Sequence, residues 1–340
     1  MKIGEIYFIR ERDRIDGGTS SYVKIGMVKD VRRDSSERLS DHQTGNPRDL
    51  ELHHVTRTAG PFRVERFLHQ QLGPNRVRSE WFRLSDEELT LAVQMAERLA
   101  EEAFVQIPIM EEAERLGQQL SSSDKIASTE ESTYWLGRLA VSKAALKLCS
   151  ELSQTYKGVT EVLPPEARIE AENEDLFLTQ YYLDEVFDSD GFDAKYPGLR
   201  AAYMSTSTKV TGRFMPTMPP VNLEEVDRDM FEFFSSFREA CDQVKVGGLA
   251  FGDLFDLRQR LEQYSGSYSW DADVADAQLR VICGTSAGIE GQVTWNRVAK
   301  EQTEYYMDVL QSEHPEKYNE FLTVRTLSRT ITRRRARRKS

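Results

Sequence analysis

The sequence predicts an α+β domain at the N-terminus and a mostly α-helical domain after it. Two observations support this fold class. Short stretches rich in β-branched and aromatic residues alternate with polar helical segments only in the first part of the chain, and helical patterns dominate later. We expect the compact domain at residues 1–84, a helical linker at 85–122, a helical domain at 123–330 and a disordered basic tail at 331–340.

Residues 3–9 and 22–27 have the composition of strands and are separated by a polar, glycine-containing turn. Residues 50–58 predict a third strand. The polar segment 33–44 predicts a helix that ends near Gly45-Asn-Pro47, where glycine and proline stop helices. Residues 62–72 predict a second helix, because their apolar side chains recur mostly every three or four positions.

The remaining segments predict a largely helical body. Ser85-Asp-Glu-Glu88 resembles a capping box and starts a helix over residues 86–104, which we expect Pro108 to interrupt. Further helices are expected at residues 134–156, 172–187, 223–244, 252–264, 295–311 and 315–327. Residues 197–220 are rich in Gly, Pro, Ser and Thr, and predict a long surface loop.

Composition describes a globular protein without a membrane span. The 340 residues are 39% hydrophobic and 30% charged, and no stretch approaches the roughly 18 apolar residues that a transmembrane helix needs. The N-terminus has no signal-peptide core. Three widely spaced cysteines, Cys149, Cys241 and Cys283, favour reduced core thiols in a cytoplasmic protein over a disulfide framework or a zinc site.

The net charge of −11 is distributed unevenly. Residues 1–84 hold 16 Lys and Arg against 12 Asp and Glu, and the C-terminal tail adds six cations, so the remainder carries −21. The basic parts are suited to a polyanion, whereas the acidic middle is suited to a protein partner or a second copy of the chain. A solvated, disordered end is the alternative for the tail. Its cations are Arg333, Arg334, Arg335, Arg337, Arg338 and Lys339.

Two pairs of chemically useful side chains occur at helical spacing. Arg38 and His42 are four residues apart, and so are Glu65 and His69, so each pair shares one helix face. A guanidinium can stabilise charge on a phosphate, an imidazole can accept a proton, and a carboxylate can bind a divalent cation. These groups indicate phosphodiester cleavage. The alternatives are solvated helix faces and, for His69, a hydrogen bond that orients Glu65.

The order of five motifs resembles the GIY-YIG nuclease superfamily, in particular its phage-encoded and meiotically up-regulated subgroup. The motifs are Gly4-Glu-Ile-Tyr7, Tyr22-Val-Lys24-Ile-Gly26, Arg38-Leu-Ser-Asp-His42, Glu65-Arg-Phe-Leu-His69 and Glu80-Trp-Phe82. The resemblance covers residues 3–84. It implies a small three-stranded antiparallel sheet flanked by helices and one Mg²⁺ or Mn²⁺ ion.

The resemblance assigns roles to several of these residues. Tyr7 matches the first signature tyrosine, Arg38 the catalytic arginine and Glu65 the metal ligand. The second signature tyrosine aligns with Lys24, and the general base stays open among Tyr7, Lys24 and His42. Tyr22 shares a strand face with Lys24 and can substitute for the missing phenol. The substrate-binding candidates are Tyr22, Lys24, Arg38 and His69.

These observations predict a divalent-metal-dependent endonuclease that hydrolyses DNA, with defence against foreign DNA as its role by analogy. The alternative is a catalytically weak or inactive nucleic-acid-binding or assembly module. A third possibility is a helical interaction protein whose partner activates the small domain.

Overall fold

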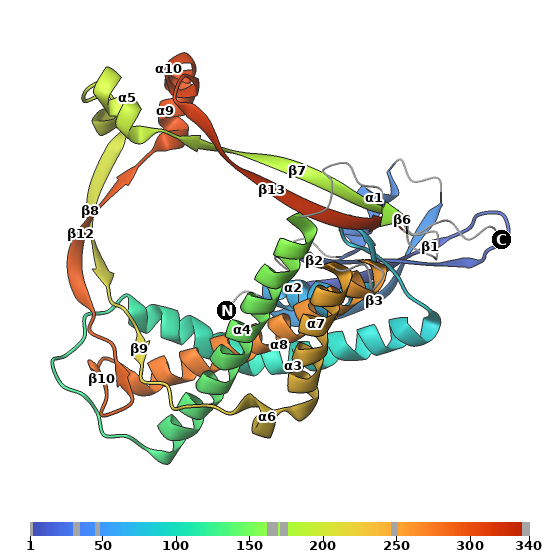
Figure 1. The fold of residues 1–340 in the computed structure, drawn as a ribbon, viewed down its shortest axis with the longest axis horizontal. Coiled ribbons are helices and arrows are strands. Elements are labelled where there is room, and N and C mark those ends of the chain that lie inside the picture. The colour runs from blue at the N-terminus through green and yellow to red at the C-terminus, as the bar shows by residue number, and fades with distance from the viewer. Residues whose placement is uncertain are drawn as a thin grey trace.

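The structure is a computed structural model that describes residues 3–29, 35–44, 48–161, 169–170, 176–245 and 251–334. It is α+β, with a five-stranded antiparallel sheet near the N-terminus and a mostly helical remainder. Figure 1 shows that two β-ribbons arch away from the helices and meet at a small tip. Within the described part of the chain, no helix combines the length and the apolar character that crossing a membrane requires.

The sheet has the strand order β3-β1-β2-β5-β4. The long strands β1 (Ile3–Arg12), β2 (Thr19–Val28) and β3 (Asp49–Ala59) are the three that the sequence predicts. The expected three-stranded sheet is nevertheless too small, because β4 (Arg76–Arg78) and β5 (Trp81–Arg83) extend it beyond β2. Three residues are too few for a strand period to be recognised in a sequence.

The alternation of side chains along β1 gives the sheet two different faces. Ile6 and Phe8 belong to the core that also contains residues of α2 (Pro61–Gln71) and of the long helix α3 (Asp86–Gly117). Tyr7 and Ile9 lie on the other face, against Leu39 of α1 (Ser35–Gln43). The candidate site lies mainly on the second face. The predicted turn at residues 45–47 falls outside the described residues.

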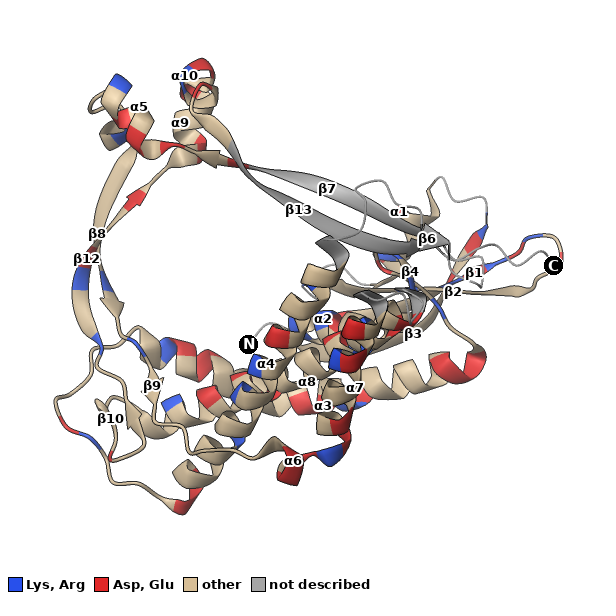
Figure 2. Cartoon of the chain, viewed as in Figure 1, with Lys and Arg blue, Asp and Glu red and all other residues tan. Residues whose placement is uncertain are grey.

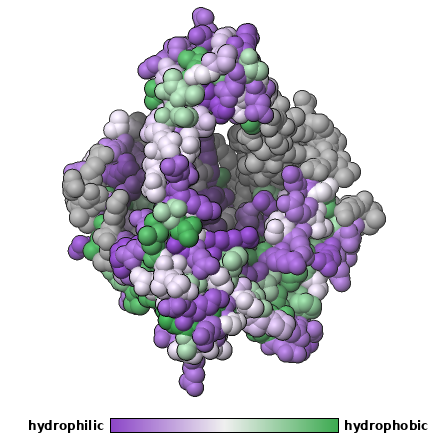
Figure 3. Space-filling model, turned by 90° about the vertical axis from the view of Figure 1, so that its left-hand side faces the viewer, coloured by the Kyte–Doolittle hydropathy of each residue, from purple (hydrophilic) through white to green (hydrophobic). Residues whose placement is uncertain are grey.

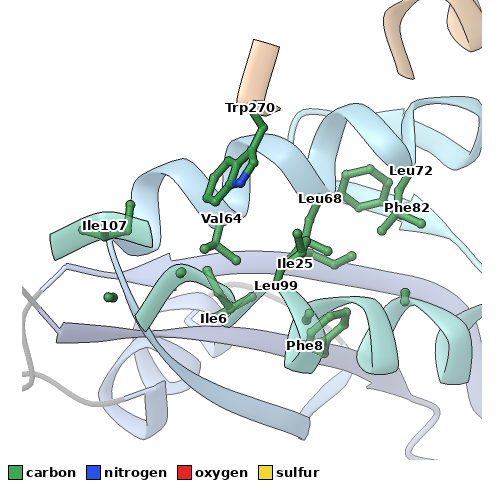
Figure 4. Close-up of a cluster of buried hydrophobic side chains, with 14 of the residues drawn as sticks. Ile6, Phe8, Ile25, Val64, Leu68, Leu72, Phe82, Leu99, Ile107 and Trp270 are labelled. Carbon is green, nitrogen blue, oxygen red and sulfur yellow. The ribbon is translucent and has the colours of Figure 1, made fainter. Parts of the chain in front are cut away.

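One hydrophobic core joins the N-terminal sheet to the helical body (Figure 4). Trp270 enters it from α8 (Phe251–Cys283), and its ring meets Phe67 of α2 edge-on at 5.8 Å between centroids. The indole N–H donates to Gln106 Oε1 on α3 at 2.6 Å. Because the indole is both packed and hydrogen-bonded, α8 positions α2 as well as the body.

Helix α3 passes through Pro108 without ending, so the predicted interruption is wrong. The predicted start is confirmed. Ser85 Oγ accepts from Glu88 N, and the Glu88 carboxylate accepts from Ser85 N, which makes a complete capping box. Proline removes one backbone donor, but Ile107 and Met110 beside it are buried, and their packing holds the helix together.

The helical body contains α4 (Glu130–Glu161), α6 (Leu223–Val226), α7 (Arg228–Lys245) and α8. Their positions confirm helices predicted at residues 134–156, 223–244 and 252–264, although α8 continues far beyond the last of these. The three cysteines are buried thiols outside any disulfide, and burial raises the pKa of the Cys149 thiol to about 12 and that of Cys283 to about 11.

The predicted helices at residues 172–187, 295–311 and 315–327 are wrong, wholly or in part; in the last of these α10 covers only residues 315–319 and β13 begins at Leu322. Strand β7 (Leu176–Phe187) lies where a helix was predicted and pairs with β13 (Leu322–Arg334). Strand β12 (Val298–Tyr305) also lies within a predicted helix and pairs with β8 (Met204–Thr211). Part of the expected loop at 197–220 is therefore strand. The smaller elements are β6 (Ile169–Glu170), β9 (Met215–Pro216), β10 (Gly288–Ile289), β11 (Val293–Thr294), η1 (Gly73–Asn75), η2 (Arg200–Tyr203), α5 (Ser189–Lys195), α9 (Met307–Glu313) and α10 (Pro315–Asn319).

The ribbon tip has its own small aromatic core. Phe192 of α5 is fully buried, and it contacts Phe187 and Phe321 at centroid distances of 5.1 and 5.5 Å. The ribbon β8/β12 below the tip is mostly exposed, and Figure 3 shows a largely hydrophilic face with small apolar patches. Strand β13 includes residues 331–334, which were expected to begin a disordered tail. Residues 335–340 lie outside the described part of the chain.

Figure 2 shows acidic residues at several places along the helical body, including the first turns of α3 and α6. The first turn of α3 contains Asp86, Glu87 and Glu88, and that of α6 contains Glu224 and Glu225. The N-terminal sheet, by contrast, has arginine on its two short outer strands. The two kinds of charge meet where Arg10 pairs with Asp86 and where Arg63 pairs with Asp273.

Candidate active site

The site begins where Tyr7 of β1 crosses Gly26 of β2. The two residues are directly opposite each other in the antiparallel pair. The Tyr7 ring covers Gly26 so closely that a Cβ on residue 26 would lie 2.5 Å from the ring carbon Cζ. Only glycine leaves room for a phenol at this position, which explains the glycine of the Lys24-Ile-Gly26 motif.

Helix α1 adds the second group of the site. The Tyr7 hydroxyl and His42 Nε2 are hydrogen-bonded at 3.2 Å, and their rings are 6.3 Å apart between centroids. Burial, followed by the charge of Glu80, raises the pKa of Tyr7 to about 12, so the phenol keeps its proton at neutral pH. Burial and then the charge of Lys24 lower the pKa of His42, so its imidazole is neutral there.

Lys24 and Glu80 form an ion pair beside these rings. The Lys24 side chain is nearly buried, and strand pairing places it opposite Trp81 on β5. Burial opposes ionisation of Glu80, but the hydrogen bond and charge of Lys24 outweigh it and leave the pKa of Glu80 lowered. The turn before β5 is unusual, because Ser79 has a φ of 51°. Such strain in a non-glycine residue is common at functional sites.

Glu65 and His69 belong to α2, and His69 contacts β2 just beyond the last residue of β2 that pairs with β5. Strand β5 pairs only with residues 22–24 of β2, and the next carbonyl, that of Ile25, accepts a hydrogen bond from His69 Nε2 at 2.9 Å. His69 also lies against Phe82, with 5.1 Å between ring centroids. The ring nitrogen thus bonds to the backbone of β2, and no hydrogen bond between His69 and Glu65 occurs among the described residues, so the predicted orienting role of His69 stays a prediction.

Burial and the neighbouring charge of Glu80 raise the pKa of Glu65 to about 7, although Lys24 acts in the opposite direction. A carboxylate that is desolvated and faces a second carboxylate gains from a bound cation. Burial also lowers the pKa of His69, so this imidazole is neutral at pH 7.

Arg38 lies one turn before His42 on α1, 3.8 Å from Asp41 and partly exposed. Its positive charge lowers the pKa of both Tyr7 and His42, and the negative charge of Glu65 acts on the same phenol in the opposite direction. Arg38 and Glu65 therefore both lie near Tyr7, although they are on helices that pack against different parts of the sheet.

The structure brings together Tyr7, Lys24, Arg38, His42, Glu65 and His69. Tyr22 is at the margin, since it is 39% exposed and lies opposite Arg83. Among the described residues, no hydrogen bond or ion pair joins the Tyr22 side chain to the others. The tail cations at 335, 337, 338 and 339 lie outside the described residues, so their role stays a prediction.

Sequence reasoning did not give Glu80 a role, although it belongs to the quoted Glu80-Trp-Phe82 motif. Its importance depends on the contact with Lys24, 56 positions earlier. Arg76 was also missed. Partial burial, opposed by the charges of Glu262, Glu80 and Glu65, lowers its pKa. No group of three or more His, Cys, Asp or Glu suited to a metal occurs within the part of the chain that the structure describes.

The fold and the site define an α+β domain in which Tyr7 is hydrogen-bonded to a neutral imidazole and lies near a guanidinium and a desolvated carboxylate. Residues 4–98 match the T5orf172 domain family. This match corrects the resemblance to the GIY-YIG superfamily, because the N-terminal residues are assigned to a different family. No curated protein and no solved structure matches the chain.

Proposed function

We propose that the N-terminal domain is a divalent-metal-dependent endonuclease that hydrolyses phosphodiester bonds of DNA. The observation that carries the proposal is that Arg38, His42 and Glu65 lie near Tyr7, with the pKa of His42 lowered and that of Glu65 raised by burial. The T5orf172 domain is loosely associated with nucleases, which supports the same class of reaction.

In the proposed reaction, the oxygen of a water molecule attacks phosphorus and the bond to the leaving oxygen breaks. His42 accepts the proton of the water, because its lowered pKa keeps an imidazole nitrogen free at neutral pH. For this role the His42 Nε2–H donates to the Tyr7 oxygen, which orients the imidazole and leaves Nδ1 as the nitrogen that accepts the proton. Arg38 stabilises the charge that develops on the non-bridging phosphate oxygens, and the leaving alkoxide takes a proton from solvent.

Lys24 acts through its charge in this proposal. Its ammonium group is paired with Glu80, which argues against its use as a proton acceptor. The same positive charge lowers the pKa of His42 and that of Glu65. Lys24 thus favours both protonation states that the reaction needs: a neutral imidazole and an ionised carboxylate.

Glu65 would hold one Mg²⁺ or Mn²⁺ ion. A single carboxylate is a suitable protein contribution, since Mg²⁺ usually retains several waters and binds substrate phosphate oxygens. When bound, the ion would neutralise charge on the phosphate and on the leaving oxygen. The raised pKa of Glu65 indicates that this carboxylate is poorly compensated by the protein itself.

Metal affinity should depend on pH through Glu65. Because its pKa is about 7, the carboxyl is protonated in acid and must release a proton to bind a cation. We expect the Mn²⁺ association constant to rise about tenfold per pH unit below pH 7 and to level off above it. Titration calorimetry between pH 5.5 and 8.5 measures this. A constant affinity over the range would contradict the assignment of Glu65 as the ligand.

The test of the function is cleavage of supercoiled plasmid and of linear duplex DNA with Mg²⁺, Mn²⁺ or EDTA. We expect cleavage only with a metal, and a loss of about 100-fold in Arg38→Gln, because a preorganised charge at the phosphate is removed. Arg14→Gln is the matched control. Arg14 is an exposed arginine paired with Asp49, and its loss should leave the rate unchanged. Absence of cleavage by the unaltered protein under every metal would refute the proposal.

A further inference from the structure

Arg76, on the short strand β4, is a guanidinium at the border of the site with no assigned role. Strand pairing places it opposite Phe82, and its guanidinium carbon lies 5.4 Å from the centre of the Phe82 ring. Phe82 is fully buried, so the platform beneath the guanidinium is rigid. His69 lies on the same ring at 5.1 Å, one helical turn from Glu65. Arg76 therefore adjoins the α2 half of the site.

The donors of Arg76 are available. Residue 76 as a whole is exposed although its guanidinium is partly desolvated, and within the described residues that guanidinium makes no hydrogen bond and no ion pair. The carboxylates of Glu262, Glu80 and Glu65 act on it only through their longer-range charge. A guanidinium stacked on an aromatic ring with free N–H groups is suited to bidentate recognition of a phosphate.

Arg76 and Arg38 serve different halves of the site. The charge of Arg38 acts on Tyr7 and His42, whereas the charge of Arg76 acts on Glu65 and His69. Two guanidiniums that act on different groups of the site suit a nucleic-acid strand, which presents a phosphate at each nucleotide.

The helical body holds the turn that precedes Arg76. Gln259 of α8 donates to the Gly73 carbonyl at 3.3 Å, and Gln71 donates to the Gln263 carbonyl at 3.1 Å. Asn75 is fixed from the other side, since its amide donates to Glu88 at 2.9 Å. The position of Arg76 therefore depends on α8, far beyond the family-matched residues in the sequence.

We propose that Arg76 forms a second phosphate subsite, which binds the backbone phosphate next to the scissile one, and that α8 positions this subsite. The proposal deepens the proposed function and rests on it. It assigns to the helical body a part in binding the substrate of the N-terminal domain.

The test compares Arg76→Gln with Arg78→Gln, which removes the same charge from the same exposed strand. Binding of a fluorescent DNA duplex is measured in EDTA over a series of salt concentrations. We expect Arg76→Gln to weaken binding and to reduce the slope of log affinity against log salt by about 0.9, as for one lost phosphate contact. Arg78→Gln should leave the slope unchanged, and Arg76→Lys should largely restore it because the charge is kept.

Steady-state cleavage supplies a second readout. Loss of a uniform phosphate contact raises KM and leaves kcat nearly unchanged. Equal slopes for the unaltered protein and Arg76→Gln, or equal losses in the two glutamine variants, would overturn the subsite. If the protein bound DNA but did not cleave it with any metal, the proposed nuclease activity would be refuted. The salt dependence of binding would still test whether Arg76 contacts a phosphate. No DNA binding by the unaltered protein would overturn both.

Discussion

Glu65→Gln should abolish most DNA cleavage while the protein stays folded. The amide has the size of the carboxylate but no charge to hold a divalent cation, so we expect a loss of about 100- to 1000-fold in kcat/KM. The measurement is plasmid cleavage under saturating Mn²⁺, together with a thermal-shift titration. Mn²⁺ should raise the melting temperature of the unaltered protein and not that of the variant, because only the former binds the ion in its native state.

Stability separates a lost ligand from a damaged fold. The pKa of the Glu65 carboxyl rises from 4.5 in the unfolded chain to about 7 in the folded protein. This shift lowers the stability of the folded state progressively as the pH rises from 4.5 to about 7, because folding then opposes ionisation of the carboxyl. Glutamine lacks this effect, so Glu65→Gln should be at least as stable as the unaltered protein at pH 8 in EDTA. Glu101→Gln, on the exposed side of α3, is the control that should retain activity. Full activity of Glu65→Gln would exclude Glu65 as the metal ligand.

Gly26→Ala should displace the Tyr7 ring and so reduce both stability and cleavage. The added methyl group would lie 2.5 Å from Cζ and 2.8 Å from Cε2 of Tyr7, which is far inside van der Waals contact. Tyr7 cannot move away freely, because it is buried and hydrogen-bonded to His42. We expect a destabilisation of about 1–3 kcal/mol, typical of overpacking. Cleavage should fall by about 100-fold, because a displacement near 1 Å is enough to spoil catalytic geometry.

Urea unfolding and plasmid cleavage measure the two parts of this prediction. Gly137→Ala is the matched control, since a Cβ at that position in α4 would meet no atom within 4 Å. Alanine there should be neutral or stabilising by about 0.5–1 kcal/mol, as expected for glycine replaced inside a helix. If Gly26→Ala were as stable and active as the unaltered protein, the close packing of Tyr7 on Gly26 would have no role in the site.

The sequence by itself determined much of the N-terminal domain. Strands β1 to β3 and helix α2 occur where their hydrophobic periods predict them, and α1 occurs within the polar segment that was predicted to be helical. The pairs Arg38/His42 and Glu65/His69 share helix faces for the same local reason. The order of the motifs suggested the wrong family, because residues 4–98 match the T5orf172 domain family and not the GIY-YIG superfamily.

Only the tertiary structure decided the ribbons and the full composition of the site. Strand β7 has a helix-compatible sequence, but it pairs with β13, roughly 140 residues later in the chain, as the register of Leu183 with Leu327 illustrates. Glu80 acquires its role through Lys24, and Arg76 through Phe82 and α8. These are contacts between distant segments. A local pattern records which conformation each segment prefers, but the partner across the fold supplies the hydrogen bonds, the charge and the burial that select one.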